Sequence, residues 1–162
     1  MLPPWLADAL KDELGPGLPP PLDALAHCPG GLAAAAGLLR DVLWGGKLPR
    51  TTKELIALAA LAAAEVAPWR DRLREALLRR GVAQDVVDDL ERKGETTRLP
   101  ERTQQVVAFG RRAALQPALL GDADYQRLRK LGLDDAELAE LLALAGLLAL
   151  LVTWSRALAV PR

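Results

Sequence analysis

The sequence predicts an all-α protein, and its composition carries that prediction. Of the 162 residues, 35 are Leu and 29 are Ala, whereas 9 are Val, 6 are Thr and 1 is Ile. Leu and Ala are among the best helix formers, and the β-branched residues that favour strands are scarce. The chain is 51% hydrophobic and 26% charged, a globular rather than a disordered composition. Its length fits one domain with a sizeable core.

The N-terminal elements are separated by proline and glycine. Residues 15–21 read Gly-Pro-Gly-Leu-Pro-Pro-Pro, and prolines fix the backbone and remove hydrogen-bond donors. We therefore expect a short helix over about 4–14, an extended arm over 15–21, and a helical domain over 22–162. Within that domain, Pro29 ends a short helix over 22–27, and Gly45-Gly46 closes a small-residue helix over 32–43.

Further breaks define the remaining helices. The helix after Gly46 is almost wholly Ala and Leu, Pro68 opens the next one, and Gly81 ends it. Gly132 ends a later helix, and Asp134 or Asp135 caps the last one. The expected helices cover residues 51–66, 68–81, 84–93, 101–115, 122–131 and 135–159.

The last of these helices is apolar nearly all round. Its uninterrupted apolar run, Leu141 to Val152, is shorter than the roughly 20 residues that a bilayer span needs, so we expect a buried core helix and no membrane contact. Burying it fully is difficult in so small a chain, which favours a homo-oligomer interface. The N-terminus lacks the basic start and apolar core of a secretory signal, and a cytoplasmic location is the default.

Charge and reactive-residue counts exclude several classes of protein. The chain has 21 Lys plus Arg and 21 Asp plus Glu, so its net charge is zero and a strongly basic nucleic-acid binder is not expected. The helix from Trp69 to Arg80 carries five Arg, but acidic residues at helix-pair spacing indicate a solvated face rather than a nucleic-acid surface. With one Cys and one His, we expect no disulfide, no metal site and no cofactor.

Two short segments offer reactive side chains, and each has a structural alternative. Glu54 is either a buried acid or base beside an apolar pocket, or the partner of Thr51 in a capping box, which the Thr-x-x-Glu spacing favours. Cys28 is either a nucleophile beside His27, or a small hydrophobic residue at a helix end, which we favour.

The order and spacing of several segments resemble the carboxymuconolactone decarboxylase and alkylhydroperoxidase D-like superfamily. The resemblance covers nearly the whole chain from about Leu22, and its C-terminal part is similar to the peroxidase-related branch. Trp154-Ser155-Arg156 departs from that branch, where Asn-Arg is usual. The segments that carry the resemblance are residues 25–32, 48–50, 53–58, 77–85, 125–138 and 154–161.

The resemblance implies an all-helical fold, a trimer or hexamer, and hydroperoxide reduction by a Cys-x-x-Cys pair with a His and a Glu as proton relay. When Gly81 fixes the alignment, the two Cys positions fall on Val66 and Trp69, and the His position falls on Leu73. Only the Glu position is retained, as Glu54. Without a thiol at these positions there is no peroxidatic sulfur. The His of the decarboxylase branch would also fall on Leu73.

These replacements predict a degenerate member of the superfamily, which binds a small apolar ligand or serves as a subunit of an assembly. A pocket filled by Val66, Trp69 and Leu73 would partly desolvate Glu54, which would then either cap its helix or meet a partner such as Arg156. Three alternatives remain: a single-Cys hydroperoxide reductase using Cys28, a decarboxylase-like enzyme using Glu54, and a nucleic-acid binding module.

Overall fold

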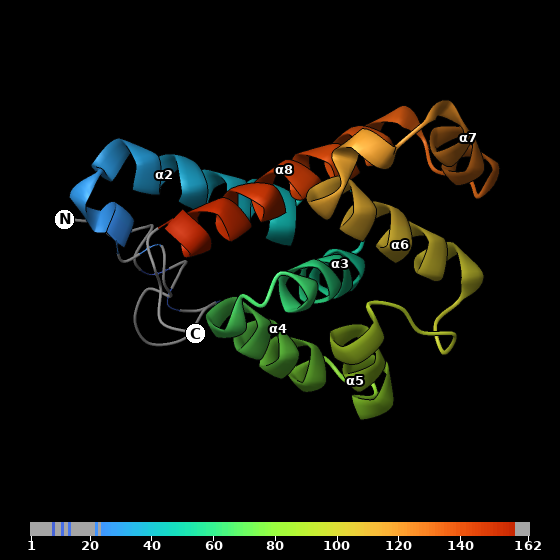
Figure 1. The fold of residues 1–162 in the computed structure, drawn as a ribbon, viewed down its shortest axis with the longest axis horizontal. Coiled ribbons are helices and arrows are strands. Elements are labelled where there is room, and N and C mark those ends of the chain that lie inside the picture. The colour runs from blue at the N-terminus through green and yellow to red at the C-terminus, as the bar shows by residue number, and fades with distance from the viewer. Residues whose placement is uncertain (1–7, 9–10, 12, 14–21, 23, 158–162) are drawn as a thin grey trace.

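The described part of the chain is built of helices, as the composition predicts. The computed structural model describes residues 8, 11, 13, 22 and 24–157, and among them there is no strand (Figure 1). The elements in order are η1 Ala24–His27, α2 Pro29–Leu38, η2 Leu39–Trp44, α3 Arg50–Ala63, α4 Ala67–Arg79, α5 Gln84–Lys93, α6 Glu101–Leu115, η3 Pro117–Leu119, α7 Asp122–Lys130 and α8 Asp135–Ala157.

Most predicted helix boundaries agree with these elements to within a few residues. The main difference concerns α2, which begins at Pro29 rather than Leu32 and continues as a π-helix, η2, to Trp44. Proline suits the first turn of a helix because the backbone N–H it lacks would have no partner there. Of the predicted N-terminal helix, Asp8, Lys11 and Glu13 are described and helical. The arm over 15–21 lies outside the described residues.

Helix α8 begins with the cap that the sequence predicts. The backbone N–H of Glu137 donates to Asp134 Oδ1 at 2.9 Å, and the backbone N–H of Asp134 donates to Glu137 Oε2 at 3.0 Å. This reciprocal pair is a capping box, which satisfies two backbone donors that have no partner within the helix. Asp134, rather than Asp135, is therefore the cap.

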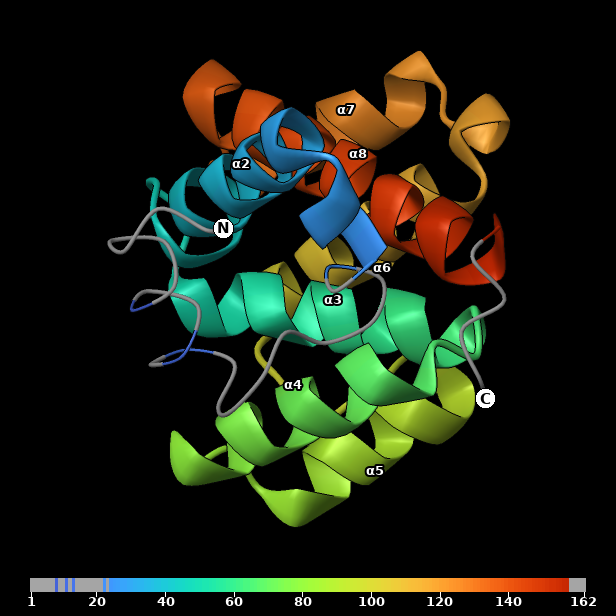
Figure 2. The same ribbon diagram turned by 90° about the vertical axis from the view of Figure 1, so that its left-hand side faces the viewer.

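Helix α3 is the centre of the fold. It packs against α4, α5, α6 and α8, and every residue from Lys53 to Leu61 is buried (Figure 2). Small side chains allow this close packing. Gly110 of α6 lies so near α3 that an added Cβ would sit 2.7 Å from Ile56 Cγ2. The Ala-rich sequence of α3 therefore reflects helices that surround it on most sides.

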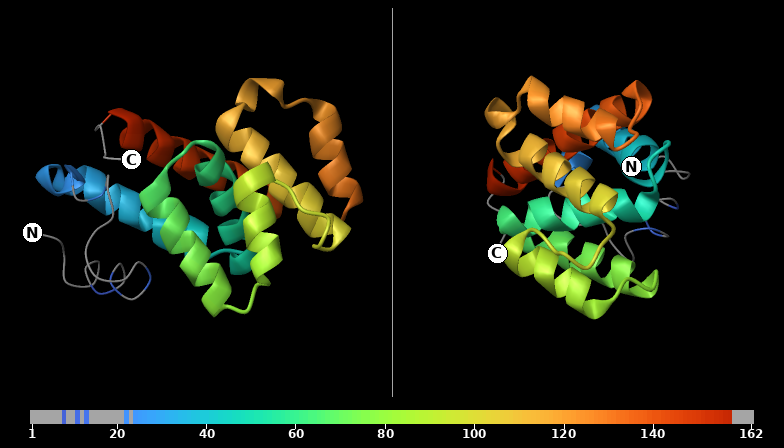
Figure 3. Two further views of the ribbon diagram at one scale, coloured as in Figure 1. Left: turned by 60° about the horizontal axis from the view of Figure 1, so that its bottom comes forward. Right: turned by 90° about the vertical axis from the view of Figure 1, so that its right-hand side faces the viewer.

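Helix α8 lies along one side of the molecule, against α6 and α3 (Figure 3). By length and composition it is the one helix among the described residues that is apolar enough to cross a membrane, with a mean hydropathy of 2.0 over its most apolar window. A core helix of a folded protein meets the same criterion, and 44% of that window is buried here. Its outer face remains exposed and is rich in small apolar residues.

Candidate functional site

Glu54 lies on the first turns of α3 and is buried, with only 1% of its surface exposed. Both of its carboxylate oxygens are paired with arginine. Arg50, one turn earlier on the same helix, donates from Nε to Oε1 at 2.8 Å, and Arg80, just after α4, donates from Nε to Oε2 at 2.9 Å. Burying an isolated carboxylate is very costly, and two charge-assisted hydrogen bonds offset that cost.

This arrangement corrects two predictions about Glu54. The capping box with Thr51 is wrong, because α3 begins at Arg50, after Pro49, and no side chain in the described part of the chain caps it. The suggested partner Arg156 is also wrong. That residue is exposed near the end of α8, and the partners of Glu54 are Arg50 and Arg80. The spacing of four residues between Arg50 and Glu54 was visible in the sequence as a helix pair.

The arginine pair extends the network to the N-terminal part of the chain. Arg50 donates from Nη1 to Oε1 of Glu13 at 2.8 Å and from Nη2 to Oε2 of the same carboxylate. The hydrogen bond from Arg50 is the main reason why the pKa of Glu13 lies below its ordinary value. The same pairing raises the pKa of Arg50, so both groups stay charged near neutral pH. Arg50 also lies over the ring of Trp44, with Cζ 5.7 Å from the centroid.

The positions that the resemblance aligns with the redox pair and its histidine are all buried. Val66, Trp69 and Leu73 belong to the hydrophobic core, at the end of α3 and along α4. Trp69 is 1% exposed, and its Nε1 has no hydrogen-bond partner among the residues that the structure describes. None of the three lines the cavity described below. The space that a pair of thiols would occupy is thus taken by packed apolar side chains.

A second buried ion pair was not anticipated from the sequence. Lys53 of α3 is 0% exposed, and its Nζ donates to Glu140 Oε1 of α8 at 2.5 Å and to the carbonyl oxygen of Gly45. The backbone N–H groups of Lys47 and Leu48 donate to Glu140 Oε2 at 2.7 and 3.1 Å. Burial raises the pKa of Glu140, but these donors together lower it by more, so the pKa lies below its ordinary value. The cluster joins α3, α8 and the loop before α3.

Glycine is required where this loop meets α8. Gly46 has a φ of +92°, and a Cβ there would collide with the carboxylate of Glu140. Any other residue would therefore strain the backbone and displace the buried ion pair. The signal for this cluster was available as a lysine within an Ala-rich helix, but the sequence did not indicate its partner 87 residues away.

Cys28 lies apart from Glu54 in the sequence and is exposed, at the N-cap position of α2. Its neighbour His27 is exposed at the end of η1. The structure gives no hydrogen bond between the two side chains. Cys28 is thus accessible, although the described residues show no partner that would activate it.

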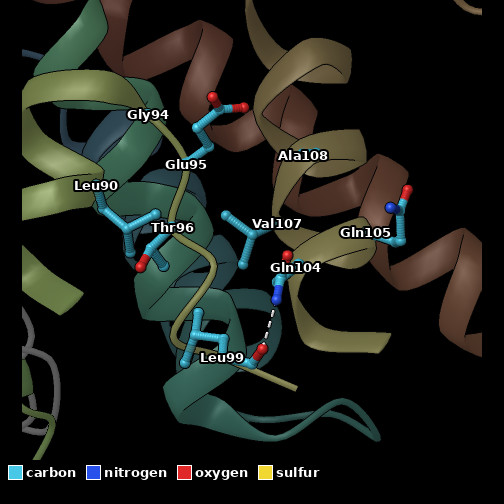
Figure 4. A pocket seen from close by; sticks show the side chains of 9 residues that line it. All are labelled: Leu90, Gly94, Glu95, Thr96, Leu99, Gln104, Gln105, Val107 and Ala108. Atoms are coloured by element: carbon cyan, nitrogen blue, oxygen red, sulfur yellow. Dashed lines mark hydrogen bonds between the residues drawn. The ribbon is translucent and has the colours of Figure 1, made fainter. Parts of the chain in front are cut away.

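A small cavity of about 110 Å³ lies between the loop after α5 and α6 (Figure 4). Gln104 reaches across it and donates from Nε2 to the carbonyl oxygen of Leu99 at 2.6 Å. Thr96 and Val107 form part of its wall. No group of three or more His, Cys, Asp or Glu side chains in the described residues is arranged to hold a metal ion.

Residues 29–98, from the start of α2 to the loop after α5, match the sequence model of the Carboxymuconolactone decarboxylase family. Solved structures similar to this one extend the likeness to the rest of the chain. The fold is that of the alkylhydroperoxidase D-like proteins. No curated protein matches the sequence.

Two of these structures are bacterial peroxidase-related proteins of uncharacterized function. The one from Silicibacter sp. TM1040 is 19% identical, with a TM-score of 0.82, over 94% of this chain and 80% of its own. The one from Ralstonia eutropha JMP134, an alkylhydroperoxidase AhpD core, is 19% identical, with a TM-score of 0.81, over 96% and 84%. A third, a variant of the debrominase Bmp8 in complex with 2,3,4-tribromopyrrole, is 18% identical, with a TM-score of 0.81, over 96% and 82%. At these identities the likeness establishes the fold alone.

Proposed function

We propose that this alkylhydroperoxidase D-like chain has lost thiol chemistry and acts by binding, either as a subunit of an assembly or as a carrier of a small ligand. The proposal rests on the way in which the buried carboxylate of Glu54 is paired. It is the one retained position of the expected relay, and both of its oxygens are already paired with Arg50 and Arg80. A proton arriving from a thiol or substrate would have to displace a guanidinium from a buried carboxylate.

The packing of α4 supports the same conclusion. A thiol peroxidase needs a thiolate to attack the peroxide and a second thiol to resolve the sulfenic acid. Val66 and Trp69 supply neither group, and they lie in the hydrophobic core. We therefore attribute no redox role to this part of the fold. A small apolar ligand at these positions would require the core to open, and its binding remains a prediction.

Assembly is supported by the outer face of α8. Exposed residues recur there every three or four positions, which places them along one side of the helix. They are Ala139, Leu142, Ala143, Gly146 and Thr153. Small residues allow a second helix to approach closely, and the face would be covered in the homotrimer or homohexamer that we propose. We place this assembly in the cytoplasm.

The assembly part of the proposal is tested by size-exclusion chromatography with light scattering. We expect a trimer or hexamer for the wild type and smaller species for Leu142→Arg, which puts a charge in the proposed interface. Leu119→Arg is the matched control, because Leu119 is an exposed leucine that belongs to η3 rather than to α8. A monomeric wild type would refute the proposed assembly.

The chemical part is tested by a hydroperoxide-reduction assay with a dithiol reductant, run on the wild type and on Cys28→Ser. A two-cysteine peroxidase of the same fold serves as the positive control. We expect no turnover above the protein-free background for either form. Robust turnover by both would contradict the proposed binding role and indicate a group other than a thiol, because Cys28→Ser contains no cysteine.

A second candidate function rests on the exposure of Cys28 at the start of α2. An accessible cysteine can, as its thiolate, attack a hydroperoxide and be recycled by an outside thiol. Turnover that disappears in Cys28→Ser would favour this single-Cys reductase over the first proposal. A decarboxylase-like reaction at Glu54 is less well supported, because the carboxylate is buried between two arginines.

A further inference from the structure

Arg50 and Arg80, which hold Glu54, direct terminal guanidinium nitrogens toward the same acceptor. Glu54 takes the Nε of Arg50 and the Nε of Arg80, on its two separate oxygens. The terminal nitrogens of both guanidinium groups are therefore left for another acceptor. In this structure that acceptor is Glu13, which Arg50 meets with both Nη atoms and which lies 3.9 Å from Nη2 of Arg80.

The charge at this place favours an anion. Two guanidinium groups and one buried carboxylate leave a net charge of +1 before Glu13 is counted. The planar guanidinium of Arg50 matches the two oxygens of a carboxylate, and such bidentate pairs are among the stronger hydrogen bonds in proteins. Arg50 is further held over the ring of Trp44. The arginines are thus oriented by groups other than the anion they bind.

The site is open to solvent on its outer side. The side chains of Arg50 and Arg80 are 25% and 36% exposed, and that of Glu13 is 30% exposed. Glu13 lies 37 residues before Arg50 in the sequence, ahead of η1 and α2. Its carboxylate binds the arginines as the carboxylate of a separate molecule would.

We propose that Arg50 and Arg80 form a binding site for the carboxylate group of a small organic acid, and that Glu13 occupies this site in the free protein. The inference deepens the ligand-binding part of the proposed function and names the class of ligand. It is independent of assembly through α8. Glu54 acts as a positioning residue, because it holds both guanidinium groups without touching the ligand.

A tethered carboxylate competes with a free one. Because Glu13 belongs to the same chain, it competes at an effective concentration of roughly millimolar, and a free acid must exceed that range to displace it. Removing the Glu13 carboxylate therefore exposes the site and strengthens binding of the free acid.

Propionate is the probe, because it reproduces the end of a glutamate side chain. Its binding is measured by NMR, from the shifts of the arginine Nε–H signals during titration. We expect Glu13→Ala to bind propionate at least tenfold more tightly than the wild type. Asp8→Ala is the matched control, since Asp8 is an exposed acidic residue on the same segment, and it should bind as the wild type does.

A second variant locates the site. Arg80→Gln in the Glu13→Ala background should weaken propionate binding at least tenfold, and a thermal melt of each variant shows whether it is folded. Propionamide, which has the same shape and no charge, should not bind. Equal binding by Glu13→Ala and the wild type, or binding that Arg80→Gln leaves unchanged in a folded variant, would overturn the site.

The result of the propionate titration can be distinguished from the result of the hydroperoxide-reduction assay. Absence of propionate binding together with absence of hydroperoxide turnover would remove this site and leave the assembly role standing. Propionate binding together with turnover would keep the site and remove the proposed loss of thiol chemistry.

Discussion

Replacing Lys53 with methionine should destabilise the protein, because it removes the cation of the ion pair that joins α3 to α8. Methionine fills a similar volume but has no charge, so Lys53→Met leaves the carboxylate of Glu140, whose side chain is 12% exposed, without its cation. The carbonyl oxygen of Gly45 loses the same donor. Glu140 keeps the backbone N–H groups of Lys47 and Leu48, which hold part of its charge.

The size of the expected loss in unfolding free energy follows from the burial of this ion pair. Removing one partner of a buried ion pair costs about 3–5 kcal/mol, because the other charge remains buried. The two backbone donors place Lys53→Met at the lower end, at about 3 kcal/mol. For a chain of this size, each kcal/mol shifts the melting temperature by about 2–4 °C, so a fall of roughly 6–12 °C is expected.

The assay is urea unfolding followed by circular dichroism, with Lys47→Met as the matched control. Lys47 pairs with Asp134 at the surface, and both side chains are about half exposed. Exposed pairs contribute about 0–1 kcal/mol, so the control should lose less than about 1 kcal/mol. Glu140→Leu in the Lys53→Met background should recover part of the loss, because it removes the unpaired charge. Equal losses for Lys53→Met and Lys47→Met would refute the reasoning.

Three further predictions concern stability. Gly110→Ala should cost about 1–3 kcal/mol in urea unfolding, because the new Cβ would press on α3. By contrast, a Cβ added at Gly37 on α2 would meet nothing within 4 Å, so Gly37→Ala should raise stability by up to about 1 kcal/mol. Equal effects of Gly110→Ala and Gly37→Ala would contradict the close packing of α6 on α3. The pKa of Glu140 in the folded protein lies below its ordinary value of 4.5. The stabilisation by its carboxylate should therefore be complete above pH 4.5 and be lost as the pH falls through the lower, folded-state pKa. Lys53→Met should lose less stability in acid than the wild type, and identical acid unfolding curves for the two would argue against this. Glu54→Gln should cost about 1–3 kcal/mol of stability, measured by thermal melting, because it removes two charge-assisted hydrogen bonds while the arginines stay partly solvated. Hydroperoxide turnover should stay at the background of the wild type, and a variant as stable as the wild type would mean that these pairs are not needed.

Predictions that depend on local sequence were the most successful. Helix α5 over 84–93 and helix α6 over 101–115 have the expected bounds, and Asp134, one of the two predicted caps, caps α8. These features follow from composition, from breaks at Gly and Pro, and from contacts within a few residues. The excess of Leu and Ala over β-branched residues was enough to predict the fold class.

Predictions about individual side chains were less successful where the answer depended on distant partners. The Thr-x-x-Glu spacing at Thr51 suggested a cap, but the helix begins at Arg50 and brings that arginine onto the side chain of Glu54. The second partner, Arg80, follows a different helix, and its approach depends on how α4 packs against α3. No pattern within a few residues of Glu54 predicts its contact with Arg80.

The sequence by itself determined that the chain is helical, where most of its helices begin and end, and that thiols are missing from the positions where the resemblance expects them. The tertiary structure decided what the remaining charged residues do. It paired Lys53 with Glu140, and it enclosed Glu54 between two arginines whose outer nitrogens hold Glu13. The physical reason is that helix formation depends on neighbours in sequence, whereas burial forces each charge to find a partner in space.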